Sequence, residues 1–182
     1  MRLVALTVIL VATPAGAEIF GNTFRSDAWG VELTVPRGWE LTEQRSYPGI
    51  IVRGFEHRTG ARIVLAVEKV AATETVKSYA EKNQKSLIKG GYRISGVATR
   101  DIGAIVLDAG TPDRKRLLRQ AYFVMGGNAY VLTVGVKAEA AKNSRPFEAF
   151  DEAMRTINIT PPEPQSRPAE APASQPVEIP NP

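Results

Sequence analysis

Short turns between neighbouring strand-like segments constrain the fold of this sequence more than any other feature. Segments with the period-two alternation or the apolar runs of strands are 29–35, 50–55, 61–70, 92–99, 104–109, 117–125 and 129–137. Turn-forming residues at 58–60, 111–113 and 126–128 join successive segments. Because such short connections join antiparallel neighbours, these pairs predict hairpins and not βαβ units.

Two segments have the 3.6-residue period of amphipathic helices. The first follows Thr73, a plausible N-cap, and ends at Gly90 and Gly91. The second follows Ser144 as N-cap, has Pro146 in its first turn, and repeats apolar residues from Phe147 to Ile157. Its aromatic and methionine stripe indicates core packing. The order of elements predicts an α+β fold, an antiparallel sheet of about six to seven strands packed with two main helices.

Residues 1–17 have the three parts of a secretory signal peptide. Arg2 precedes an apolar run, Pro14 follows it, and small residues occupy positions 15 and 17. The run is too short for a spanning helix, and the chain has no cysteine to carry a lipid. We therefore expect cleavage after Ala17 and an exported protein, periplasmic or extracellular, that does not span the membrane.

Proline content sets the other boundary. Eight of the 13 prolines fall within residues 161–182, a segment without glycine or aromatic residues. Such a segment buries too little apolar surface to offset its ordering entropy, which predicts a disordered tail that serves as a spacer or a docking segment. The sequence thus predicts a signal peptide (1–17), one folded domain (18–160) and a proline-rich tail (161–182).

The composition leaves few groups for catalysis. There is no cysteine, which excludes thiol nucleophiles, disulfides and thiolate metal sites, and His57 is the only histidine. No phosphate-binding glycine loop, calcium loop or Gly-x-Ser-x-Gly motif is present. We therefore predict no catalytic residue, no cofactor and no metal site.

Two segments are candidates for an interaction surface. The segment 37–49 is long for a hairpin connection and carries Trp39, Arg45 and Tyr47, although Trp39 can equally close the edge of the core. The densest basic patch is Arg114, Lys115, Arg116 and Arg119, which forms either a solvated hairpin end or a contact for an anionic surface. The formal net charge is +4, but an exported protein rarely meets nucleic acid, so we expect none as a partner.

The segment Trp29-Gly30-Val31-Glu32-Leu33-Thr34-Val35-Pro36-Arg37-Gly38-Trp39, the hairpin at 62–70, the capped helix, the 122–133 hairpin and the final helix resemble the PsbP-like superfamily. The resemblance covers about 130 residues. It implies an α/β/α sandwich with helices on both faces of an antiparallel sheet. It also implies a role in binding other macromolecules instead of catalysis. His57 alone cannot supply the histidine-containing metal sites of photosynthetic members, so no site residue is carried across.

The sequence therefore predicts an exported, non-enzymatic accessory or binding module of the cell envelope. Its partner would be an envelope protein or an anionic cell-envelope polymer. The alternative is a small-ligand carrier or a hydrolase with a pocket between sheet and helix, using carboxylates such as Asp101 and Asp108. The oligomeric state does not follow from the sequence.

Overall fold

The computed structural model of this chain describes residues 18–20, 23–42, 45–47, 50–139 and 145–160. The predicted signal peptide (1–17), the proline-rich tail (161–182) and the predicted cap Ser144 lie outside these residues. The division of the chain into these three parts therefore stays a prediction.

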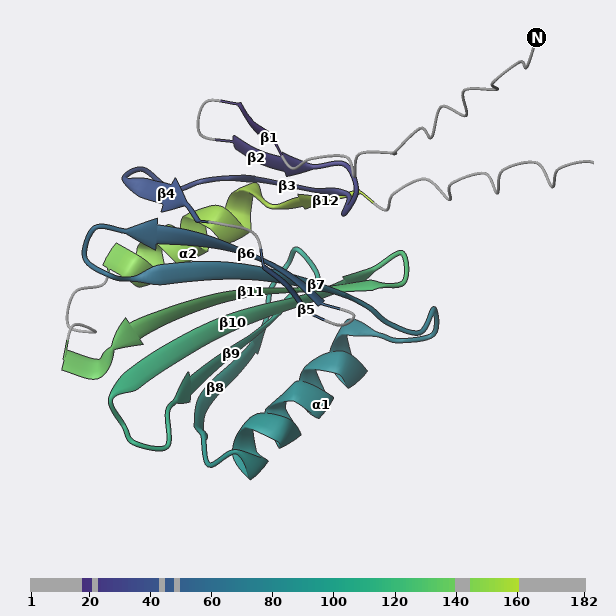
Figure 1. Cartoon of the computed structure of the whole chain (residues 1–182). Helices are drawn as coiled ribbons and strands as arrows, with labels where there is room; N and C mark the ends of the chain where they lie inside the picture. The colour runs from purple at the N-terminus through teal and green to yellow at the C-terminus, as the bar shows by residue number, and fades with distance from the viewer. Residues whose placement is uncertain (1–17, 21–22, 43–44, 48–49, 140–144, 161–182) are drawn as a thin grey trace, which may run out of the picture.

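Two helices and two antiparallel sheets make up the described domain (Figure 1). The small sheet has the order β1-β2-β3-β12, with β1 (Glu18–Phe20), β2 (Thr23–Ser26), β3 (Val31–Thr34) and β12 (Asn158–Ile159). The large sheet has the order β4-β6-β7-β11-β10-β9-β8, and β5 also pairs with β6. Its strands are β4 (Trp39–Leu41), β5 (Arg45–Tyr47), β6 (Ile50–His57), β7 (Arg62–Lys69), β8 (Arg93–Thr99), β9 (Ile105–Gly110), β10 (Arg116–Met125) and β11 (Asn128–Lys137). The helices are α1 (Val76–Lys89) and α2 (Arg145–Thr156).

The predicted hairpins form the centre of the large sheet. Strands β6 and β7, β9 and β10, and β10 and β11 pair as antiparallel neighbours across the turns expected from the sequence. The α+β fold class, with its antiparallel strands and two helices, is confirmed.

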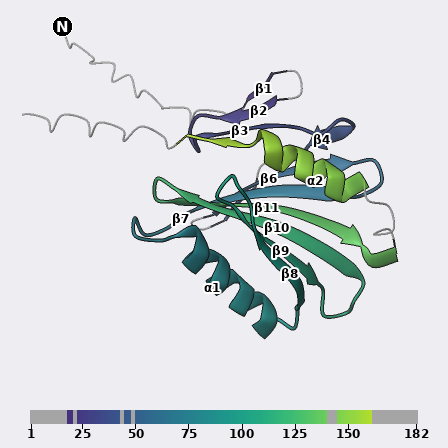
Figure 2. The ribbon, with the colours of Figure 1, turned by 180° about the vertical axis from the view of Figure 1, so that it is seen from behind.

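Alternate residues of the central strands face two cores on opposite faces of the large sheet. On β10, Tyr122 packs in the core under α1, where its ring meets Tyr79 at 6.0 Å. Its neighbours Ala121 and Phe123 belong to the other core, together with Phe150 of α2. Figure 2, seen from behind Figure 1, shows α2 and the small sheet on the face away from α1. Helices on both faces, as the resemblance implies, are therefore present.

The strand predicted at 29–35 belongs to the small sheet and not to the large one. Val31 and Leu33 of β3 are buried against the α2 core, and β12 pairs with β3 after α2 has brought the chain back. Trp29 lies in the turn before β3, where its carbonyl oxygen accepts a hydrogen bond of 2.6 Å from the Tyr130 hydroxyl. The single sheet of the sequence prediction is thus divided, because β3 covers the large sheet and does not extend it.

The N-cap of helix α1 lies two residues after the predicted one. Thr75, not Thr73, is the N-cap: its hydroxyl accepts from the Ser78 backbone N–H at 3.1 Å, and the Ser78 hydroxyl accepts from the Thr75 N–H at 3.2 Å. This reciprocal pair satisfies two backbone donors at the helix start. The predicted end of the helix is confirmed, since Gly90 is the C-cap.

The segment 37–49, predicted as one loop, contains two short strands, β4 and β5, and the prediction is wrong for those residues. Trp39 pairs with His57 and Arg45 pairs with Val52, so β4 and β5 run along the outer edge of β6. By pairing with β6, β4 and β5 satisfy backbone groups of β6 that would be unpaired if β6 were an exposed edge strand. Residues 43–44 and 48–49 lie outside the described residues.

Candidate functional site

One end of the large sheet gathers nine exposed cations that come from separate segments of the sequence. The β6–β7 turn, the β9–β10 turn, the end of β11, the start of β8 and the start of β4 all lie at this end, as the strand registers require. The C-terminus of α1 is there too, because the Cβ of an alanine at Gly91 would lie 3.4 Å from Pro112. We call this end of the sheet the basic end.

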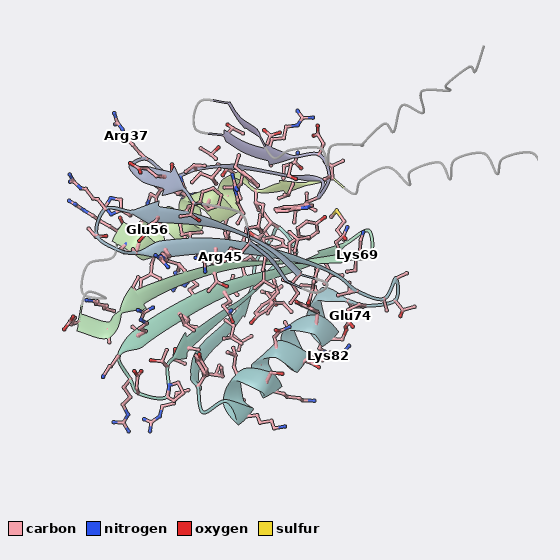
Figure 3. All side chains as sticks on the ribbon, in the orientation of Figure 1. Arg37, Arg45, Glu56, Lys69, Glu74 and Lys82 are labelled. Carbon is pink, nitrogen blue, oxygen red and sulfur yellow. The ribbon has the colours of Figure 1, made fainter. Side chains whose placement is uncertain are left out.

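The exposed cations of the basic end are Arg37, Arg58, Arg62, Lys89, Arg93, Arg114, Lys115, Arg116 and Lys137. The same end carries the carboxylates Glu40, Glu56, Asp113 and Glu139. Seven strands from β4 to β8, at about 4.8 Å spacing, make this end roughly 30 Å wide. Figure 3 labels Arg37 at this end and Lys69 at the opposite one. The cations therefore form a row across the sheet and not one compact patch.

The β9–β10 turn holds three of these cations in a hydrogen-bonded tip. The Asp113 carboxylate accepts from the Thr111 hydroxyl at 2.6 Å and from the Lys115 backbone N–H at 3.0 Å. These hydrogen bonds hold the pKa of Asp113 below its usual range, and the bond from Thr111 has the largest effect. Arg114 has the left-handed backbone angle φ of 58°, which is uncommon for a residue with a side chain. The tip thus presents Arg114, Lys115 and Arg116 to solvent on an ordered turn.

Arg119, the fourth member of the predicted basic patch, does not lie with the other three. Its side chain lies on the face of the sheet that α2 covers. Nε donates to Asp108 of β9 at 2.8 Å, and Nη1 lies 3.4 Å from Asp151 of α2. Its guanidinium also lies 5.0 Å from the Phe147 ring centroid. The hydrogen bond to Asp108 is the main cause that holds the pKa of Arg119 above its usual value. Arg119 joins α2 to the sheet and is not exposed for a partner.

Trp39 lies at the basic end, beside the only histidine. The Trp39 and His57 ring centroids are 5.5 Å apart and the rings are tilted by 44°. Trp39 is partly buried and packs against the core under α2, so it does close the edge of the core. The ring nevertheless lines a groove of about 400 Å³ between the β6–β7 turn and α2, which we call the Trp39 groove.

The Trp39 groove mixes cations with carboxylates. Its charged lining residues are Arg37, Arg58, Arg145, Arg155, Glu148 and Glu152. Arg37, His57 and Arg58 also line a second hollow, on the Glu40 and Glu56 side of the same turn. Among the residues that the structure describes, neither Arg37 nor Arg58 has an ion-pair partner.

The turn orients the His57 ring. His57 Nδ1 lies 2.8 Å from the Thr59 hydroxyl and 3.3 Å from the Thr59 backbone N–H. The backbone N–H can only donate, so this pair of contacts favours the neutral tautomer with Nδ1 as acceptor and the proton on Nε2. Gly38, with φ of 83°, lies against this ring: an added Cβ would be 3.5 Å from Nε2. Arg37 and Trp39, the chain neighbours of Gly38, line the Trp39 groove together with His57. His57 was not a candidate in the sequence analysis, and its pairing with Trp39 follows only from the register of β4 and β6.

Arg45 and Tyr47 are not part of this groove. Arg45 is exposed and pairs with Val52, and Tyr47 pairs with Ile50, at the end of β6 remote from His57. The side chain of Tyr47 lies outside the described residues. Trp39, Arg45 and Tyr47 therefore do not form one aromatic rim, because the chain between them runs along the whole of β6.

The carboxylates considered for a hydrolase do not converge. Asp101 is exposed in the β8–β9 turn, at the end opposite the basic end, whereas Asp108 binds Arg119 in mid-strand. Within the described ranges, no three acidic or histidine side chains come together in a way that could hold a metal ion. Within the same ranges, neither helix has the length and apolar character needed to cross a membrane.

Comparisons with known proteins find relatives by structure only. No protein-family description matches the sequence, and no curated protein matches it. The solution structure of cyanobacterial PsbP (CyanoP) from Synechocystis sp. PCC 6803 has a TM-score of 0.54 at 12% identity, covering 85% of this chain and 99% of that one. LpqN of Mycobacterium tuberculosis, described as involved in cell envelope biogenesis, has a TM-score of 0.52 at 18% identity, covering 72% and 83%.

A third structure, a putative regulator of unknown function from Pseudomonas aeruginosa, has a TM-score of 0.51 at 18% identity, covering 71% of this chain and 92% of that one. At these identities the likeness concerns the fold. The fold of this chain is that of PsbP-like proteins, as the sequence resemblance implied.

Proposed function

We propose that this chain, which has the PsbP-like fold, is an exported, non-enzymatic module of the cell envelope that binds an anionic envelope polymer along its basic end. In this proposal residues 1–17 direct export and are removed, and residues 18–160 form the binding domain. LpqN, which has a similar fold and is described as involved in cell envelope biogenesis, supports the proposal that this chain also acts in the envelope.

The row of exposed cations across the sheet is the observation that carries the proposal. A row roughly 30 Å wide matches an extended ligand with repeated negative charges better than a single small anion. The side chains at the tip of the β9–β10 turn are exposed, so they reach a polymer without unfolding any element. The formal net charge is +4 for the whole chain and +3 once Arg2 is removed with residues 1–17, and this excess of positive charge favours approach to a polyanion at moderate salt.

The test measures binding of residues 18–182 to immobilised polygalacturonate and poly(glycerol phosphate) at several salt concentrations. We expect binding to both, weakening steeply as salt rises, because the contacts are exposed charges. The variant Arg114→Gln, Lys115→Gln, Arg116→Gln should bind about tenfold more weakly or worse, since each lost contact removes part of the attraction.

A matched control removes the same charge at the opposite end of the domain, from β7, from the start of α1 and from the β8–β9 turn: Lys69→Gln, Lys77→Gln, Arg100→Gln, all of them exposed residues. It should keep its affinity within about twofold. Equal losses in the two triple variants would mean that net charge alone drives binding, and would defeat the proposal. Binding only to phosphatidylglycerol vesicles, or only to an envelope protein, would also defeat it.

A further inference from the structure

The Trp39 groove is the hollow of the basic end in which an aromatic ring lies together with arginines and carboxylates of α2. At the tip of the β9–β10 turn three exposed cations surround one carboxylate, Asp113, which already accepts hydrogen bonds within the turn. The groove instead places carboxylates of α2, among them Glu152, beside arginines and an aromatic ring. A simple polyanion gains nothing from those carboxylates, because like charges repel. A ligand that suits the groove must therefore offer more than negative charge.

Each kind of lining group fits one part of a sugar. Arginine side chains bind carboxylate or phosphate groups through paired N–H donors, and Arg37 and Arg58 have no ion-pair partner among the described residues. Carboxylates accept hydrogen bonds from hydroxyl groups, which Glu152 can do here. The Trp39 ring offers an apolar surface for the C–H face of a pyranose ring.

Size and donor placement agree with one such unit. About 400 Å³ lies in the lower part of the range found for small-molecule sites. In its neutral form His57 carries a proton on Nε2, next to Gly38 and between the two hollows that share Arg37 and Arg58. His57, which lines both hollows, is therefore placed to serve as a third donor.

We propose that the Trp39 groove binds a single anionic sugar unit, a hexose bearing a carboxylate or a phosphate, of the polymer that the basic end attracts. This inference rests on the proposed function and names the unit that the module recognises. The arginines and His57 bind the anionic group, Trp39 lies against the ring, and Glu152 accepts from its hydroxyl groups.

The test is isothermal titration calorimetry of the full predicted mature chain with glucuronate and with glucose 6-phosphate. Glucose, inorganic phosphate and acetate are the matched probes that lack either the charge or the ring. We expect at least one anionic sugar to bind with a dissociation constant on the order of 1 mM or lower, and each incomplete probe about tenfold more weakly or worse. Whichever of the two sugars binds identifies carboxylate or phosphate as the natural group.

Two variants assign the binding to the groove. Arg37→Gln with Arg58→Gln changes exposed residues only and should weaken anionic-sugar binding about tenfold or more, because it removes both unpaired cations. Trp39→Phe should abolish the change in tryptophan fluorescence on titration, since the other tryptophan, Trp29, is buried away from the groove. Because Trp39→Phe also touches the core, circular dichroism must show that it is folded, and the arginine pair keeps the test valid if it is not.

The outcomes separate this inference from the proposed function. The triple variant at residues 114–116 should keep its affinity for the sugar and lose the polymer. If inorganic phosphate or acetate binds as tightly as the anionic sugars, or if no sugar binds while the polymer does, the groove inference is wrong and the proposed function stands. If sugars bind but neither polymer does, the proposed function is wrong.

Discussion

Arg119 of β10 donates to Asp108 of β9 at 2.8 Å, directly across the register in which these two residues are partners. The same guanidinium approaches Asp151 of α2 at 3.4 Å and lies over the Phe147 ring. One side chain therefore connects two strands of the large sheet with the helix on its α2 face. Its side chain is 22% exposed, so water screens these contacts only in part.

Replacing Arg119 should test this connection. We expect Arg119→Gln to lower the free energy of unfolding by about 1–3 kcal/mol, because it leaves the half-buried carboxylates Asp108 and Asp151 without their cation. Urea denaturation followed by circular dichroism measures the loss. The neighbouring Arg116→Gln is the control and should change stability by less than about 0.5 kcal/mol, as an exposed charge. Equal losses of unfolding free energy in the two variants would contradict the structural role assigned to Arg119.

The start of α1 gives a second prediction with a built-in control. Thr75→Ala should destabilise the protein by about 1 kcal/mol, since it removes the acceptor for the Ser78 N–H. Thr73→Ala, at the cap expected from the sequence, should have almost no effect because Thr73 is exposed and precedes the helix. Thermal or urea unfolding of the two variants compares them directly. A larger loss for Thr73→Ala would place the helix start where the sequence pattern put it.

Arg114 separates stability from binding. A backbone φ of 58° lowers the stability of the folded state by about 1–2 kcal/mol at a residue with a side chain, and glycine avoids this strain. Glycine also raises the conformational entropy of the unfolded chain, which offsets part of the gain. Arg114→Gly should therefore leave the free energy of unfolding unchanged or raise it by about 1 kcal/mol, while polymer binding weakens. The measurements are urea unfolding and the polymer assay on the same preparation. A clear loss of stability would show that the Arg114 side chain supports the turn.

Tyr122 predicts how the protein behaves at alkaline pH. Burial raises the pKa of Tyr122 to about 12, and its hydroxyl donates to Gln120 at 2.7 Å. In the unfolded chain a tyrosine ionises near pH 10, so the stability due to this shift is complete below about pH 10 and is lost as pH rises towards 12. The difference in unfolding free energy between the wild type and Tyr122→Phe should be constant from pH 7 to about 9 and shrink above pH 10. A difference that stays constant up to about pH 11 would contradict the sign of the shift.

Much of the fold follows from local pattern. The hairpins, both helices and the end of α1 at Gly90 could be predicted because turn residues and side-chain periodicity are local signals. The small sheet could not be predicted, since β12 pairs with β3 across more than a hundred residues and no periodicity reports such a pairing. The strands β4 and β5 were missed because each has only three residues.

The candidate site shows the same division. Arg114, Lys115, Arg116 and Trp39 could be singled out as residues, but only the strand order and register bring them to one end of one sheet. Lys89, Arg93 and Lys137 were missed although each stands at the boundary of a predicted element, a signal that sequence reasoning can use. Arg119 could have been separated from its neighbours, because it shares the strand parity of the buried Ala121 and Phe123.

The small sheet also determines from which side the rest of the chain is attached. Its last hydrogen bond joins the Thr160 N–H to the Gly30 carbonyl oxygen at 2.8 Å, next to Trp29 and at the end of the molecule remote from the β6–β7 turn (Figure 1). Any chain that continues from Thr160, such as the 161–182 segment, therefore starts behind the basic end. In the proposed function the chain after residue 160 therefore leaves the domain on the side away from the polymer. For the same reason, a tag placed after residue 160 would attach the protein to a sensor surface from behind, with the Trp39 groove and the β9–β10 turn facing the solution.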